Sequence, residues 1–200
     1  MEREMLTVGL AELVDHCGQV GVFVDGANAA RMPERLGGTE DAHRGIDFQK
    51  LKVFLESLGR VAFLRYYTAR DYTSGVEQFF RVLESLGFKI VRIETRTFSD
   101  GQRKGNLDSR IMMDAVELAD KFDTAVLISG DGDFLPCVKF LLERGKRVVV
   151  LSSQYGLSRD LRMSGARIVF LDDLAKQVTC LRSASRGRPV TPTHVGHRSW

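Results

Sequence analysis

Short apolar runs alternate along this chain with stretches whose apolar residues recur at helical spacing. Val20–Val24 is a compact run of the kind buried on both faces of a parallel sheet, and further strands are predicted at Arg60–Tyr67, Phe88–Ile93, Ala125–Ile128, Arg147–Leu151 and Arg167–Phe170. Helical patterns lie between them, over residues 48–58 with Asp47 as N-cap, then 76–86, 107–121, 135–144 and 157–163. This alternation predicts an α/β fold with a central, mostly parallel sheet of five or six strands between two helical layers. Residues 31–47, rich in glycine, proline and charge, are predicted to form a long mobile loop.

Two of the predicted strands end in acidic residues. GVFVDGAN places Asp25 after the first strand, and AVLISGDGDF places Asp131 and Asp133 after the fourth. Ligands of such sheets bind outside the carboxyl ends of the strands, so these acids share one edge if the two strands are neighbours. Asp108 begins the predicted helix that follows the polar loop TRTFSDGQRKGN, and we expect it to reach the same edge.

The negative charge of such a cluster of acids has to be compensated. Two carboxylates about 4 Å apart repel by roughly 4 kcal/mol at an effective dielectric constant of about 20, so the cluster takes up protons, pairs with bases or holds a cation. An all-oxygen site without histidine or cysteine suits Mg²⁺ or Mn²⁺. Simpler roles compete: Asp25 as a helix cap or turn former, and Asp108 as an acid favoured by the helix dipole. Asp114 lies roughly 240° around the helix from Asp108, which favours a structural role.

Four motifs in order carry a family resemblance. They are VFVDGAN, KGNLDSRIMMDAVELA, VLISGDGDFLPCVKFLLERGKRVVVL and GLSRDLRMSGARIVFLDDL, and together they resemble the NYN domain of the LabA-like family over about residues 18–175. The resemblance implies a PIN-like (Rossmann-like) fold and Mg²⁺- or Mn²⁺-dependent cleavage of RNA phosphodiester bonds. It implies that the catalytic and metal-binding acids are Asp25, Asp108, Asp131 and Asp133. Asn28 matches the asparagine of the family's first strand, and Asp114 the second acid of its helix motif.

An RNA substrate requires groups that hold phosphates and bases. The candidates for substrate binding are Asn28, Arg96, Arg103, Lys104 and Ser129, with Arg31 and Arg35 after the first strand as further bases. Tyr66 and Tyr67 end the second strand, where they either stack on a base or lie half-buried.

Composition sets the expected domain organisation. We divide the 200 residues into an N-terminal helical lead-in at 1–17, the NYN/PIN-like domain at 18–175 and a basic, disordered C-terminal tail at 176–200. The net charge of +3 comes from this tail, because residues 182–200 hold four arginines and no acid. The tail either attracts RNA without sequence preference or is a plain disordered end.

Composition also limits the cellular location and the binding partners that we expect. No apolar run approaches the length of a membrane span, and three scattered cysteines indicate reduced thiols, so we expect a cytoplasmic protein that does not bind membranes. RNA is the expected partner; a homodimer and a protein partner bound through the tail are left open.

Three function hypotheses are weighed. The first is a metal-dependent ribonuclease, endonucleolytic by preference. The second is a non-catalytic RNA- or protein-binding regulator that uses the same fold. The third, phosphoryl transfer of the haloacid-dehalogenase or receiver type, is disfavoured because the first strand ends in DGAN without a DxD pair.

Overall fold

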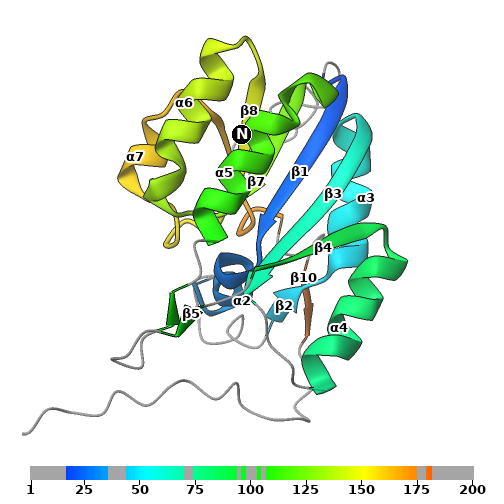
Figure 1. Ribbon diagram of the computed structural model, residues 1–200. Coiled ribbons are helices and arrows are strands. Elements are labelled where there is room, and N and C mark those ends of the chain that lie inside the picture. Colours follow the sequence, from blue (N-terminus) through cyan, green and yellow to red (C-terminus); the bar gives the residue numbers. More distant parts are fainter. Residues whose placement is uncertain are drawn as a thin grey trace, which may run out of the picture.

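A six-stranded sheet runs through the protein (Figure 1). The computed structural model describes residues 17–35, 44–69, 74–93, 96–97, 103–104, 107–174 and 179–181. The strand order is β4-β3-β1-β7-β8-β9, and every neighbouring pair is parallel. The strands are β1 (Gln19–Asp25), β3 (Arg60–Ala69), β4 (Phe88–Ile93), β7 (Thr124–Ile128), β8 (Arg147–Ser152) and β9 (Arg167–Phe170). The predicted α/β class is therefore confirmed.

Helices cover both faces of the sheet and create two cores. α2 (Gly26–Arg35), α3 (Phe48–Leu58) and α4 (Ser74–Ser85) contribute to one core, and α5 (Leu107–Glu117), α6 (Leu135–Glu143) and α7 (Arg159–Arg162) to the other. β7 is buried along its whole length because side chains of both faces contact helices. The predicted N-cap of α3 is confirmed: Asp47 Oδ1 accepts hydrogen bonds from the backbone N–H groups of Gln49 and Lys50, both at 3.1 Å.

The prediction of a loop over residues 31–47 is wrong at both ends. α2 begins directly after β1 and extends to Arg35, and its Met32 is fully buried in the core. β2 (Arg44–Ile46) pairs antiparallel with β10 (Thr179–Leu181). β10 lies within the segment expected to be a disordered tail, so these three residues differ from that expectation. Residues 1–16 of the predicted helical lead-in and residues 182–200 lie outside the described residues.

Two further boundaries differ from the predicted ones. The helix predicted over 107–121 divides into α5 and the short 3-10 helix η2 (Ala119–Lys121), and Ile111, Ala115 and Ala119 are buried. Within the predicted polar loop, β5 (Arg96–Thr97) and β6 (Arg103–Lys104) form an antiparallel pair. Among the described helices, none combines the length and apolar character that crossing a bilayer requires.

Candidate functional site

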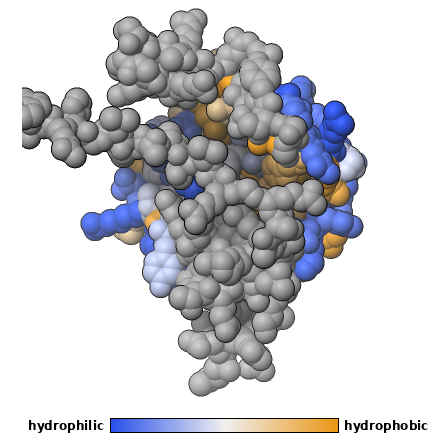
Figure 2. Space-filling model, turned by 90° about the horizontal axis from the view of Figure 1, so that it is seen from below, coloured by the Kyte–Doolittle hydropathy of each residue, from blue (hydrophilic) through white to orange (hydrophobic). Residues whose placement is uncertain are grey.

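The two strands with acidic ends are neighbours in the sheet. β1 and β7 pair in parallel register with Val24 opposite Ile128, so Asp25 and Ser129 follow at the same level. All six strands point toward this edge, which lies at the lower end of the molecule in Figure 1 beside α2. Figure 2 views the molecule from that end, and the described residues at its margin are mainly hydrophilic, with apolar residues showing between them. The predicted meeting of the two acidic strand ends is confirmed.

Asp25 is buried and hydrogen-bonded through both carboxylate oxygens. Its Oδ1 accepts from the backbone N–H of Asn28 at 3.0 Å, which is a capping interaction at the start of α2. Its Oδ2 accepts from the Ser129 hydroxyl at 3.0 Å. Burial raises the pKa of Asp25, and these two hydrogen bonds oppose that rise. The cap expected of a simple turn residue is present, together with a second contact that comes from β7.

A hydrogen-bonded chain continues from Asp25 to the second acidic motif. Ser129 Oγ accepts from the backbone N–H of Asp131 at 3.2 Å, and Asn28 Oδ1 accepts from that of Gly130 at 3.3 Å. Asp131 is half-buried, and its Oδ1 caps the 3-10 helix η3 (Gly132–Phe134) by accepting from the backbone N–H of Asp133 at 3.1 Å. Ser129 thus fixes Asp131 relative to Asp25, while Asp133 is exposed to solvent.

Asp108 brings the fourth carboxylate to this edge. It lies in the first turn of α5, which packs beside β1 and η3. Burial raises the pKa of Asp108, and the negative charges of Asp25, Asp131 and Asp133 raise it further. The four predicted acids, from β1, α5 and the η3 turn, therefore lie at one edge, where Asp108 feels the charge of the other three. We call Asp25, Asp108, Asp131 and Asp133 the acidic edge.

Bases do not neutralise the acidic edge within the described ranges. None of its four carboxylates forms an ion pair there; the recorded pairs join Lys52 to Glu56, Arg92 to Glu77, and Arg65 and Arg110 to Asp114. Arg31, exposed on α2, is the base whose charge acts on Asp25. Counted over the described residues alone, the edge consequently has an excess of negative charge.

The oxygen atoms of the acidic edge are of the chemical type that binds hard divalent cations. Carboxylate and hydroxyl oxygens are the ligands that Mg²⁺ and Mn²⁺ prefer. Among the described residues, however, no three acidic, histidine or cysteine side chains are gathered closely enough to form a closed coordination group. The acidic edge is a set of neighbouring oxygens that would have to draw together around an ion.

Several predicted substrate-binding residues have other surroundings. Asn28 and Ser129 are buried and hydrogen-bonded within the site, so we assign them to holding the strand ends. Tyr66 and Tyr67 are also buried, at 6% and 0% exposed, so of the two alternatives for them burial holds and stacking on a base does not. Arg96, Arg103 and Lys104 lie on β5 and β6, and their side chains, like that of Arg35, are outside the described residues.

Asp114 has a separate environment, as its position on the helix indicates. It is 1% exposed, pairs with Arg65 through Oδ2 and faces Arg110 Nη2 from Oδ1 at 2.8 Å. The Tyr67 hydroxyl donates to Asp114 Oδ2 at 2.8 Å, and burial followed by this hydrogen bond raises the pKa of Tyr67. The predicted structural role of Asp114 agrees with these contacts.

Sequence reasoning missed the close approach between Gly130 and the loop after β8. A Cβ placed on Gly130 would lie 2.0 Å from the Gly156 carbonyl oxygen and 2.6 Å from Ser152 Oγ, so only glycine fits. Ser158 donates its backbone N–H to Gly130 O at 2.8 Å. The signal for this contact was a second glycine-containing turn, SQYG, after the neighbouring strand.

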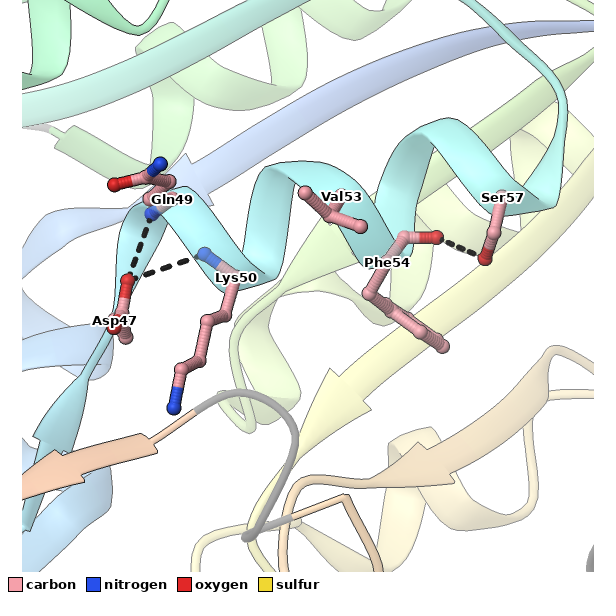
Figure 3. Close-up of a pocket in the computed structure, with 6 residues that line it drawn as sticks. All are labelled: Asp47, Gln49, Lys50, Val53, Phe54 and Ser57. Carbon is pink, nitrogen blue, oxygen red and sulfur yellow. Dashed lines mark hydrogen bonds between the residues drawn. The ribbon is translucent and has the colours of Figure 1, made fainter.

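A hollow elsewhere on the surface is unrelated to the acidic edge. It measures about 530 Å³, and its lining residues in the described part of the chain are Asp47 and members of α3 (Figure 3). Phe54 is the buried apolar member and Val53 the exposed one. α3 belongs to the core opposite α5, and the hollow holds one acid, which already caps the helix.

Comparison with known proteins identifies the family. The model of the NYN domain, which has a PIN-like, nuclease-type fold, matches residues 19–172. The chain is 26% identical to the low amplitude and bright protein LabA of Synechococcus elongatus over 162 residues, which cover 78% of this chain and 85% of LabA. An uncharacterized protein of Methanocaldococcus jannaschii is 25% identical over 72% of this chain, which spans about half (51%) of that relative. A crystal structure of a Vibrio parahaemolyticus protein of unknown function aligns with a TM-score of 0.72 and 25% identity, over 83% of this chain and 98% of that one. This chain belongs to the NYN domain family.

Proposed function

We propose that the protein is a metal-dependent ribonuclease that hydrolyses RNA phosphodiester bonds, by preference endonucleolytically. One observation carries this proposal: Asp25, Asp108, Asp131 and Asp133 lie at the same carboxyl edge of the sheet, where burial and then the charges of the other three acids raise the pKa of Asp108. In the described part of the chain, none of the four is paired with a base. The NYN family membership supports the same reaction class by analogy.

Asp108, Asp131 and Asp133 are the proposed ligands of Mg²⁺ or Mn²⁺, with Asp25 at the back of the set. Asp25 is the most deeply buried of the four, and each of its oxygens already accepts a hydrogen bond. A carboxylate oxygen has two lone pairs, so these hydrogen bonds leave acceptor capacity. When bound, such an ion lowers the pKa of a coordinated water and stabilises charge on a phosphoryl oxygen.

The protein's own contribution is to hold the acids in place before substrate arrives. Ser129 fixes the Asp25 carboxylate relative to the Asp131 backbone, and the η3 cap restricts the orientation of the Asp131 side chain. Phosphates of RNA require positive charge beside this acidic edge. Arg31 on α2, and Arg96, Arg103 and Lys104 of β5 and β6, are the proposed sources of it.

The test is Mn²⁺-dependent cleavage of RNA by the purified full-length protein. Asp131→Asn should lower the cleavage rate by about 10²–10³-fold, the typical loss when one preorganised electrostatic group is removed. Asp120→Asn is the matched control, because Asp120 is an exposed acid on η2 at the opposite end of β7. Thermal unfolding of each variant checks the fold. Equal cleavage by wild type and Asp131→Asn would overturn the proposed site.

A non-catalytic regulator on the same fold is the second candidate. The absence of a closed three-residue metal group among the described residues favours it. Under this alternative, the protein binds RNA or a protein partner without taking up Mn²⁺. Calorimetric titration of Mn²⁺ into the protein distinguishes the two candidates, since only the ribonuclease requires binding.

A further inference from the structure

The most exposed aromatic ring in the described part of the chain belongs to a turn whose backbone packs against Gly130, the residue before Asp131. Tyr155 is 77% exposed and occupies the turn between β8 and α7. Single exposed apolar residues are common on protein surfaces and need no functional explanation. The backbone around Tyr155 sets it apart from an ordinary exposed residue.

The turn that carries Tyr155 is held by hydrogen bonds on both sides. The backbone N–H of Gln154 donates to Asp172 Oδ2 at 2.8 Å. On the other side, the backbone N–H of Gly156 donates to Ser153 Oγ at 3.0 Å, and that of Leu157 donates to Ser153 O at 3.1 Å. Leu157 is buried in the core beneath the turn. The ring of Tyr155 is therefore presented to solvent from an anchored backbone.

The same turn packs directly against the residue before Asp131. The Gly156 carbonyl lies where a side chain of Gly130 would be, and Ser158 donates to Gly130 O at 2.8 Å. Because Gly130 is bonded to Asp131 and Gly156 to Tyr155, the backbone that carries the Tyr155 ring lies beside the acidic edge. Figure 1 shows α7 and the preceding loop on the same side of the sheet as α5 and α6.

A base accompanies this ring. Arg159 begins α7 four residues after Tyr155, is exposed, and has no ion pair within the described ranges. An exposed aromatic ring and an arginine carried by one short segment are the combination that binds nucleotides of single strands, with the ring stacking on a base and the cation near a phosphate.

We propose that Tyr155 stacks on an unpaired base of single-stranded RNA next to the bond that the acidic edge cleaves, with Arg159 contacting the adjacent phosphate. A base within a duplex is already stacked on its neighbours, so this contact selects single-stranded RNA. The inference rests on the proposed function for its substrate class and for the position of the scissile bond.

Binding of a short fluorescent single-stranded RNA, measured by anisotropy, tests the proposal in the uncleaving Asp131→Asn background. Tyr155→Ala should weaken binding by about 5- to 150-fold, the range found for loss of one stacked base. Tyr155→Phe and Tyr155→Trp should retain the affinity, because both keep an aromatic face. Met163→Ala is the matched control, since Met163 is equally exposed at 77% and follows α7. Thermal unfolding verifies that each variant is folded.

A matched oligonucleotide with abasic sites separates stacking from attraction to phosphates. The Tyr155→Ala effect should disappear with this probe, whereas Arg159→Ala should still weaken binding. Equal affinity of the Asp131→Asn protein with and without Tyr155, loss of affinity in Tyr155→Phe, or no RNA binding at all would overturn the inference. RNA cleavage at the same rate by wild type and by Tyr155→Ala would also overturn the inference, but it would leave the proposed function standing. Tyr155-dependent binding without any cleavage would support the inference and remove the proposed function.

Discussion

Two acids on the same helix have opposite surroundings. Asp114 is buried in α5 against Arg65 and Arg110, with the Tyr67 hydroxyl as an additional donor. Asp108, six residues earlier, is half-buried beside three further carboxylates. Two arginines pair with Asp114, whereas Asp108 has no ion pair among the described residues. Among the described residues, the carboxylates of the acidic edge therefore have no paired base, whereas the charge of Asp114 is paired within the chain.

Asp114→Ala should produce the largest loss of stability. Removing the carboxylate leaves Arg65, whose side chain is 17% exposed, without its partner and the Tyr67 hydroxyl without its acceptor. The free energy of unfolding should fall by about 3–5 kcal/mol, as is typical when one member of a buried pair is removed. Urea unfolding followed by circular dichroism measures this change. A loss below that of an exposed acid such as Asp120→Ala would contradict the structural role.

Tyr67→Phe removes one hydroxyl donor from Asp114 and leaves the arginines in place. Loss of a hydrogen bond to a charged group should lower the free energy of unfolding by about 1.5–3 kcal/mol. RNA cleavage, assayed at a temperature where the variant is folded, should stay near the wild-type rate because Asp114 lies outside the acidic edge. A cleavage defect without a stability defect would place Tyr67 in the functional site instead.

Ser129→Ala is the corresponding change at the acidic edge. It removes the donor to Asp25 Oδ2 and the acceptor of the Asp131 N–H. The free energy of unfolding should fall by about 1–3 kcal/mol, from buried polar groups left unsatisfied. The cleavage rate should fall as well, unlike that of Tyr67→Phe, because both acids lose their shared link. Comparison of the two variants by urea unfolding and cleavage assay separates the regions; equal activity in both would erase the distinction.

Asp108→Asn should have the smallest effect on stability, and in the opposite direction. Removing one of four mutually repelling carboxylates should raise the free energy of unfolding by about 0.3–1 kcal/mol, reduced by solvent screening of a half-buried group. Added salt should narrow the difference between variant and wild type, because salt screens the repulsion. Thermal unfolding without divalent metal, at low and high salt, measures both effects. A destabilised variant would show that Asp108 is already compensated.

Local patterns predicted the elements that local chemistry determines. Asp47 caps α3 by accepting hydrogen bonds from the backbone of its near neighbours Gln49 and Lys50. The angle between Asp108 and Asp114 around α5 correctly predicted that the two acids have different surroundings. Contacts between distant segments were not predictable in this way. The Ser129–Asp25 hydrogen bond spans 104 residues, and β2 pairs with β10 from the far end of the domain. Pro33 and the charges around it concealed α2, whose stability comes from burial of Met32 and Ala29 in the core.

At the acidic edge, residue type alone did not show which neighbouring side chains are buried. Asn28, Ser129, Tyr66 and Tyr67 are polar or aromatic residues at strand ends, which is the usual pattern of substrate contacts. All four are buried because the close approach of β1, β3 and β7 encloses them. The ring that is exposed, Tyr155, lies on the loop after β8, outside the motifs that first marked the site.

Calorimetric titration of Mn²⁺ tests most directly whether the acidic edge awaits a cation. Wild type and Asp114→Asn, if folded, should bind the ion with similar affinity, whereas Asp131→Asn and Asp108→Asn should each bind it at least about tenfold more weakly, a difference of about 1.4 kcal/mol. Binding of equal strength in wild type, Asp131→Asn and Asp108→Asn, or no binding in wild type, would contradict the account.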